Sequence, residues 1–298
     1  MTAVGTEPRQ VDLREPAGWR RTKNRIMTWL MVLSFILVII PLGFVLVTVI
    51  AKGASAISWS FLTSQIPSIV APPGVGGIGP AVLGTIEIVA LATIIAVPLG
   101  VLGAVYLNEY GGKNPLAAFI GFMSDVMTGV PSIIMGLFIF SIWVLHFGFS
   151  GLAGAFALAC LMLPIVIRSS YEMLRLVPNA LREGSYALGA TKARVTLTVV
   201  LPAAIGGIVS GALLAVARAA GETAPLLFTI LTVTAANPNV FSGANTSLPS
   251  QIFSNANQPY VGAQDRGWGA ALTLIAICFI LMIVARLVTA RFARYARY

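Results

Sequence analysis

The chain has 298 residues, of which 57% are hydrophobic and only 10% are charged, and its mean hydropathy is +0.90. Soluble globular domains carry about 25% charged residues, so this composition excludes a soluble domain of any size. The formal net charge of +9 follows from uneven loops between membrane spans, and we expect no nucleic-acid partner.

Six apolar runs are long enough to cross a bilayer, which requires a helix of ~20 residues. In chain order they cover about residues 27–49, 81–107, 116–145, 152–167, 203–231 and 268–285. The first run is too long for a signal peptide and no small-residue cleavage site closes it, so we interpret it as an uncleaved anchor. The sequence therefore predicts an all-α, polytopic protein of the inner membrane with six transmembrane helices.

Basic residues divide the loops into two kinds. All of the 19 lysines and arginines except Lys52, Arg266 and Arg218 lie in both termini and in the second and fourth loops. Because positive loops stay in the cytoplasm, both termini and these loops are predicted to be cytoplasmic. The predicted parts are a basic tail at 1–26, a first helix with an outer loop at 27–80, a transmembrane core at 81–290 with a cytoplasmic loop at about 175–202, and a basic end at 291–298.

Two of the predicted spans carry a carboxylate. Glu87 lies in the second span, and Asp125 lies in the third, just before a segment in which Gly129 and Pro131 loosen the helix. A charge at the centre of a bilayer costs at least about 2.5 kcal/mol, so these side chains should face protein or a water path. Both are candidate partners for the arginine of the fifth span.

A polar segment interrupts the apolar chain before the fifth span. Pro178 suits the first turn of a short helix, and Gly189 stands where a helix ends in the left-handed conformation. Thr191 can cap a second helix that enters the membrane, where Pro202 begins or kinks the fifth span. Such a helical hairpin either lies on the lipid surface or is presented to a soluble partner, and local pattern leaves both open.

The fifth span contains an ion pair and a proline within one short stretch. Arg218 and Glu222 are four residues apart and therefore share a helix face. Pro225 cannot donate a hydrogen bond to the carbonyl of Gly221, so we expect the helix to bend here. The pair has two interpretations: it locks helix packing, or it lines a path in which the guanidinium lowers the barrier for an oxyanion.

The sequence contains no pattern typical of a catalytic or metal centre. Cys160, Cys278 and His146 stand apart, without the partners that a metal or redox site needs. The glycines of 74–79 and 184–189 lack the strand and the lysine that nucleotide-binding loops require. We therefore expect a non-catalytic chain that binds no cofactor or metal.

Residues 183–202 resemble a loop pattern of ABC importer permeases, in which Glu-Ala-Ala, a glycine and Ile-x-Leu-Pro follow at fixed spacing. Glu183 and Gly189 take the first two places, and Pro202 closes the pattern. Gly184, Ser185 and Val199 depart from it without changing the spacing. In that family the element is the coupling helix, which docks in a groove of the ATPase subunit. The residues that the resemblance assigns to this contact are Glu183, Tyr186, Leu188 and Gly189.

A wider resemblance, from about Gly76 onward, is to the A-type subunits of phosphate ABC importer permeases. The segments that carry it are GGIGPAVLGT, YLNEY, GVPSIIMGLF, VPNALREGSYALGATK, RAAGETAPLLFT and LPSQIF. It implies import of inorganic phosphate by this chain together with a homologous C-type permease, two ATPase subunits and an extracytoplasmic phosphate-binding protein. ATP and Mg would be bound by the ATPase. Candidate residues of the translocation path are Arg218, Gly221, Glu222, Glu87 and Asp125.

Two other functions remain open at this point. An ABC permease for another oxyanion or a small solute would carry the same coupling helix. A secondary carrier or channel would need no ATPase, but carriers usually show internal repeats with paired broken helices, and the sequence shows no such self-similarity.

Overall fold

The computed structural model describes residues 18–112 and 114–295, apart from the side chains of residues 288, 289 and 291–295. The chain divides into two compact units, one up to Thr48 and one from Val49 onward. The first unit consists of most of helix α1 (Gly18–Gly53), which is long and apolar enough to span a membrane. Parts of the predicted basic ends, residues 1–17 and 296–298, lie outside the described residues.

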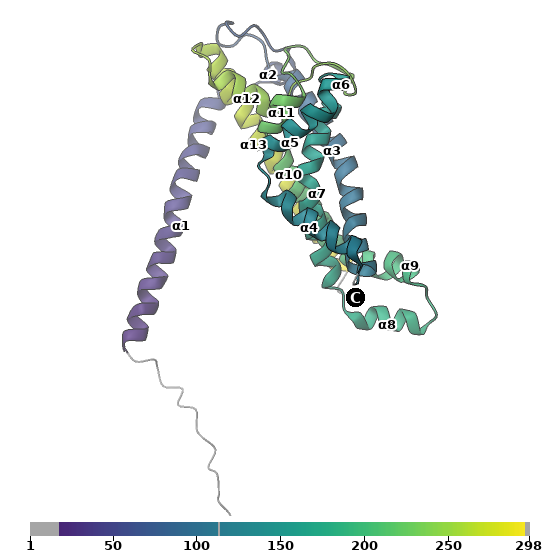
Figure 1. Cartoon of the computed structure of the whole chain (residues 1–298). Helices are drawn as coiled ribbons and strands as arrows, with labels where there is room; N and C mark the ends of the chain where they lie inside the picture. The colour runs from purple at the N-terminus through teal and green to yellow at the C-terminus, as the bar shows by residue number, and fades with distance from the viewer. Residues whose placement is uncertain (1–17, 113, 296–298) are drawn as a thin grey trace, which may run out of the picture. The chain divides into compact units, whose positions relative to one another are not determined.

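The second unit is a bundle of helices (Figure 1). Its long helices are α3 (Gly79–Val105), α7 (Gly151–Arg175), α10 (Leu201–Ala220) and α13 (Val261–Tyr295). The shorter elements are α2 (Trp59–Thr63), α4 (Pro115–Gly129), α5 (Ser132–Ile139), α6 (Leu145–Phe147), α8 (Asn179–Ala187), α9 (Lys192–Val195), α11 (Ala224–Thr229) and α12 (Leu248–Ala256), together with the π-helical turns η1 (Tyr106–Tyr110), η2 (Phe140–Val144) and η3 (Thr196–Val200). No strand occurs among the described residues, so the prediction of an all-α membrane protein is confirmed.

The core of this unit lies where α3, α7 and α10 pack against one another. Many of its buried side chains are alanines, which let helix backbones approach closely, as is typical between membrane helices. The largest cluster includes Ile88, Ala92, Ala96, Ala155, Leu158, Ala159, Met162, Ala215 and Ile230. Many of the large apolar side chains of α3 and α13 point outward instead, which fits a bundle surrounded by lipid or by a partner subunit.

The third apolar run is a sharply bent helix pair rather than one straight helix. It divides into α4 and α5, whose axes meet at 110° across a break at residues 130–131. Pro131 disfavours helical geometry in the residue before it, and Val130 is accordingly extended, with φ −77° and ψ 128°. The loosened helix predicted at Gly129 and Pro131 is thus a complete break between two helices. The described residues hold five helices of membrane-spanning length and composition, or six if this bent pair is counted as one span.

The fifth apolar run also differs from its prediction. A single membrane-length stretch begins earlier, at Lys192, passes through α9 and η3 and ends with α10 at Ala220. The π-helical turn η3 ends two residues before Pro202, whose missing N–H interrupts regular α-helical bonding. The helix then stops, rather than bends, before Pro225, which occupies the first turn of the separate helix α11.

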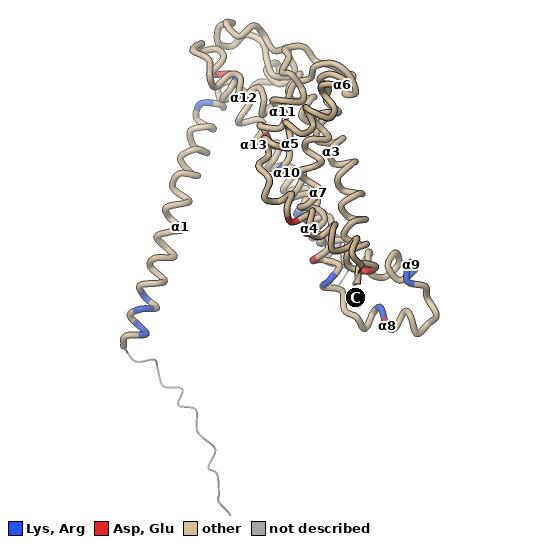
Figure 2. Tube along the Cα trace, viewed as in Figure 1, with Lys and Arg blue, Asp and Glu red and all other residues tan. Residues whose placement is uncertain are grey.

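The two ends of the second unit have different elements. Helices α8 and α9 lie at one end of the bundle, and α2, α6, α11 and α12 lie at the opposite end (Figure 1). Lysine and arginine positions occur on α8 and beside α9, whereas the helices between the two ends carry few charged residues (Figure 2). At the α12 end, the buried guanidinium of Arg266 donates hydrogen bonds to the carbonyls of Ser68 and Ile69 and so holds the loop before α3.

Candidate coupling loop and translocation site

The polar segment before α10 folds into a helical hairpin. Helix α8 follows Pro178 and ends in a Schellman motif, because the N–H of Gly189 donates to the carbonyl of Tyr186 at 2.9 Å and that of Ala190 to Ser185 at 3.2 Å. Gly189 has φ +81°, a conformation that costs a non-glycine residue about 1–2 kcal/mol. The predicted helix and its glycine stop are thus confirmed.

The second helix of the hairpin begins where expected but is capped differently. Helix α9 starts at Lys192, directly after Thr191, whose backbone is extended with φ −72° and ψ 156°. The Thr191 side chain forms no capping hydrogen bond, so the prediction of a side-chain cap is wrong. The turn is therefore set by Gly189 and the Schellman bonds.

The residues predicted for ATPase coupling gather on the outer surface of this hairpin. Glu183 and Tyr186 are exposed on α8, and Leu188 at its end has 90% of its surface exposed. The Leu188 side chain therefore offers apolar surface at the tip of a polar hairpin, and no other residue in the described part of the chain covers it. The arrangement suits docking into a groove.

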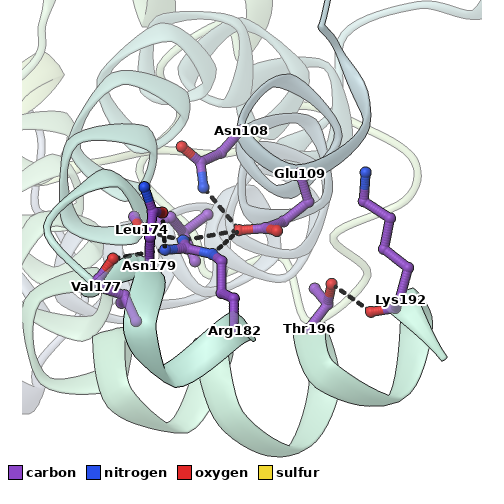
Figure 3. Close-up of polar contacts among 8 residues, drawn as sticks. All are labelled: Asn108, Glu109, Leu174, Val177, Asn179, Arg182, Lys192 and Thr196. Atoms are coloured by element: carbon purple, nitrogen blue, oxygen red, sulfur yellow. Dashed lines mark hydrogen bonds and ion pairs between the residues drawn. The ribbon is translucent and has the colours of Figure 1, made fainter. Parts of the chain in front are cut away.

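Helix α8 also carries a buried ion pair that its sequence does not predict (Figure 3). The guanidinium of Arg182 lies 3.0 Å from Oε1 of Glu109 in η1, and the two side chains are 12% and 5% exposed. Arg182 also donates to the carbonyls of Leu174, at 2.9 Å, and Val177 at the end of α7. Asn108 donates to the same carboxylate oxygen at 2.7 Å.

This pair leaves little trace in the sequence. In the sequence, Arg182 is one of several basic residues in a predicted cytoplasmic loop. Glu109 belongs to YLNEY, a segment that indicates only the family resemblance. The two residues are 73 positions apart, so no helical periodicity connects them. The one available signal was an acidic residue directly after an apolar run, on the same predicted side as the basic loop.

The charged pair of the fifth run lies at the end of α10. Nε of Arg218 is 3.8 Å from Oε1 of Glu222, and the two side chains are 70% and 20% exposed. Helix α10 ends at Ala220 with Gly221 as its C-cap, and the N–H of Glu222 still donates to the carbonyl of Ala219. The two side chains therefore come together as predicted, although Glu222 already lies beyond the helix.

Arg218 and Glu222 line a cavity of about 210 Å³. The other walls are the break between α4 and α5, residues 127–132, and the middle of α7, residues 161–165. The long ion pair occupies few of the guanidinium N–H groups, and within the described residues no other carboxylate pairs with Arg218. Such a guanidinium beside a cavity can bind an oxyanion through two parallel hydrogen bonds.

The other two carboxylates do not pair with Arg218. Asp125 forms an ion pair with Arg168 of α7 at 3.0 Å, with side-chain exposures of 55% and 61%. Glu87 is half-buried on α3, and no ion pair joins it to Arg218 in the described ranges. Both predictions of a partner for Arg218 are therefore wrong, because Arg168 competes for Asp125 and Glu222 is nearer. Arg168 itself lies within α7 rather than in a loop.

Within the part of the chain that the structure describes, no three histidine, cysteine or acidic side chains cluster so that they could hold a metal ion. The site thus consists of an exposed helical hairpin at one end, a cavity with one arginine between helices, and a buried ion pair beneath the hairpin.

The helices of membrane-spanning length and the exposed hairpin belong to a region that matches a family of transport proteins. The family model described as "Binding-protein-dependent transport system inner membrane component" matches residues 96–294, which include α8, α9 and the Arg218 cavity. Solved structures show the same fold. A permease chain of a bacterial alginate ABC importer aligns with a TM-score of 0.62 and 14% identity over 92% of this chain and 98% of its own. One from the inward-facing MetNI methionine ABC transporter aligns with a TM-score of 0.54 and 20% identity over 74% and 94%.

Curated relatives are considerably more similar. PstA 1, a phosphate transport system permease protein of Mycobacterium tuberculosis, is 42% identical over 90% of this chain and 89% of its own length. PstA of Yersinia pestis is 40% identical over 93% and 94%, and that of Haemophilus influenzae is 43% identical over 87% and 92%. The chain therefore belongs to the binding-protein-dependent transport system inner membrane component family and, within it, to the PstA phosphate transport system permeases.

Proposed function

We propose that this chain is the A-type permease subunit of an ATP-driven importer that moves inorganic phosphate across the inner membrane into the cell. The observation that carries the proposal is the 70% exposed side chain of Arg218 beside the cavity between α4, α5, α7 and α10. Placing an arginine within a membrane-spanning helix costs free energy, so such a residue marks a path for a charged solute. The names of the relatives agree with phosphate as that solute.

In the proposed complex the chain is non-catalytic. It pairs with a homologous C-type permease and receives phosphate from an extracytoplasmic binding protein, while two ATPase subunits bind ATP and Mg. The basic residues of the hairpin end support a cytoplasmic position for α8 and α9, where the ATPases dock. No cofactor is bound by this chain.

The hairpin is the proposed contact with the ATPase. Glu183 offers a charge, and Tyr186 and Leu188 offer exposed apolar surface that can enter a groove. Gly189 gives the left-handed turn that orients these side chains. ATP-driven closure of the two ATPases then displaces α8, and the hairpin passes this displacement to the spans.

The cavity at the end of α10 is the proposed path. Arg218 attracts the phosphate oxyanion, and Glu222 prevents the arginine from holding it too tightly, because a transporter must also release its cargo. Gly221 ends α10 and so places both side chains at the cavity. Glu87 and Asp125 remain candidates for further contacts along the path.

The test is uptake of radiolabelled phosphate into proteoliposomes that contain this chain, the C-type permease and the ATPase. Binding protein is supplied outside and ATP inside, and vesicles with ADP serve as the control. We expect ATP-dependent uptake that excess sulfate does not compete away. Sulfate competition would indicate a permease for another oxyanion, and equal uptake with ADP would indicate a carrier or channel; either result contradicts the proposal.

A further inference from the structure

The buried pair of Glu109 and Arg182 does not line the proposed translocation cavity. Glu109 and Arg266 are the ionisable residues that are buried within the described part of the chain. Removing a carboxylate and a guanidinium from water is costly unless their remaining hydrogen bonds are satisfied. The geometry of the Glu109–Arg182 pair shows how this free-energy cost is offset.

The guanidinium of Arg182 connects three segments at once. It binds Glu109 of η1 through Nε at 3.3 Å and Nη2 at 3.0 Å, and the carbonyl of Leu174 near the end of α7. It also binds the side chain of Asn179, at the start of its own helix, at 3.2 Å. Since its N–H groups point in fixed directions, the planar guanidinium holds η1, α7 and α8 in one relative position.

The residue next to Glu109 holds the other helix of the hairpin. The ammonium group of Lys192, at the start of α9, lies 5.0 Å from the centre of the Tyr110 ring. A cation over an aromatic face at this distance is attracted by the ring. Consecutive residues of η1 thus contact α8 and α9 separately.

On its other side, η1 is tied to the membrane-length helices. It continues α3 without a break and connects to α4 through a short turn. A Cβ atom added to Gly111 in that turn would lie 2.6 Å from the carbonyl oxygen of Leu107 and 2.9 Å from Cβ of Ala117, so the turn packs tightly. Asn114, which caps α4, also donates to the hydroxyl of Tyr106 at 2.9 Å.

Helix α4 leads from this turn to the break that lines the Arg218 cavity. A continuous chain of contacts therefore runs from the hairpin through η1 to α4. π-helical turns are rare and are found frequently at functional sites, which agrees with a special role for η1.

We propose that η1 is the joint that fastens the α8–α9 hairpin to α3 and α4, with the Glu109–Arg182 ion pair as its fixed contact and Tyr110–Lys192 as its second. This inference rests on the proposed function, because it assigns to the joint the transmission of ATPase movement to the spans. Glu109 and Arg182 are positioning residues: they act through the placement of α8 and α4 and touch neither cargo nor ATP.

The first test measures the joint without reference to the cargo. Cys160 and Cys278 are replaced by alanine, and spin labels are attached at Ala118→Cys on α4 and Ala180→Cys on α8, both exposed positions. Electron-spin distance measurements on the assembled complex should give one narrow distance with or without ATP. Glu109→Gln or Arg182→Met should broaden it. An equally narrow distance in these variants would overturn the proposal.

The second test separates the joint from mere stability. The double variant Glu109→Gln/Arg182→Met leaves neither buried charge without its partner, so its folding should recover relative to the single variants. The phosphate transported per ATP hydrolysed should nevertheless stay reduced, by about two- to thirtyfold, the range in which substitutions along a coupling route act. Recovery of this ratio together with folding would show that the pair only stabilises the fold.

A matched control is Arg175→Met, which removes an exposed arginine from the last turn of α7 near the same end of the bundle. It should leave both the spin-label distance and the transport ratio unchanged. If the wild-type complex transports no phosphate, the proposed function fails, but the spin-label result still decides whether η1 is the joint.

Discussion

Two arginine–carboxylate pairs of the same chemistry lie at different places in this chain. Arg182 and Glu109 are 3.0 Å apart and almost fully enclosed, whereas Arg218 and Glu222 are 3.8 Å apart with the arginine 70% exposed. A buried pair with satisfied hydrogen bonds fixes a geometry, because either partner alone would be a buried charge. An exposed and longer pair can exchange one partner for a ligand.

The backbone around each pair agrees with this difference. Arg182 lies inside α8 between a helix start at Pro178 and a Schellman stop at Gly189, so its position is well defined. Arg218 lies in the last turn of α10, where the helix ends before Glu222. Helix ends open more easily than helix centres. The first pair therefore suits transmission of movement, and the second suits transient binding.

The largest effect is expected from breaking the buried pair. Glu109→Gln leaves the guanidinium of Arg182 buried without its counter-charge, which should destabilise the chain by about 3–5 kcal/mol. A lower apparent unfolding temperature of the purified complex in detergent checks this. An unchanged unfolding temperature would mean that water reaches the pair and that its burial is not maintained in the complex.

The next largest effect concerns the exposed pair. Arg218→Gln should reduce phosphate uptake by about tenfold or more, since a hydrogen bond to a charged group contributes about 1.5–3 kcal/mol. Arg218→Lys keeps the charge but loses the paired geometry, so its uptake should fall between wild type and Arg218→Gln. Both variants should assemble and unfold like the wild type. Wild-type uptake in Arg218→Gln would show that the pair only supports packing.

A smaller effect should follow from a change in the hairpin turn. Gly189→Ala places a side chain at φ +81°, at a cost of about 1–2 kcal/mol, and should weaken co-purification of the ATPase. Gly184→Ala in α8 is the matched control, because a methyl group there meets no atom within 4 Å and alanine favours a helix. Equal behaviour of the two variants in co-purification would contradict the role assigned to the turn.

The smallest effect should come from the third pair. Asp125→Asn breaks its exposed contact with Arg168, and exposed ion pairs contribute about 0.2–1 kcal/mol. The unfolding temperature of the complex should therefore change little. A loss of stability similar to that of Glu109→Gln would show that burial does not separate these pairs, and it would remove the basis of the comparison.

Much of the fold follows from local sequence. Apolar length predicts the membrane helices, and the spacing of Pro178 and Gly189 predicts α8. The shared face of Arg218 and Glu222 follows from their separation of four residues. These features depend on neighbours in sequence, for which helix geometry is sufficient.

The remaining features depend on packing between distant segments. Pro131 signals a loosened helix, but the 110° angle between α4 and α5 is set by the helices around them. The pairs Glu109–Arg182 and Asp125–Arg168 join different helices, so side-chain charge alone could not assign their partners. Asp125 was matched with the wrong arginine for this reason.

The most direct test records phosphate uptake and ATP hydrolysis together in the same proteoliposomes, for Arg218→Gln and Glu109→Gln. We predict that Arg218→Gln loses uptake but keeps the stimulation of ATP hydrolysis by phosphate-loaded binding protein, because its joint is intact. Glu109→Gln should keep unstimulated hydrolysis and lose the stimulation, because the hairpin no longer follows the spans. If both variants lose uptake and stimulation alike, the two pairs do not have separate roles and the account is contradicted.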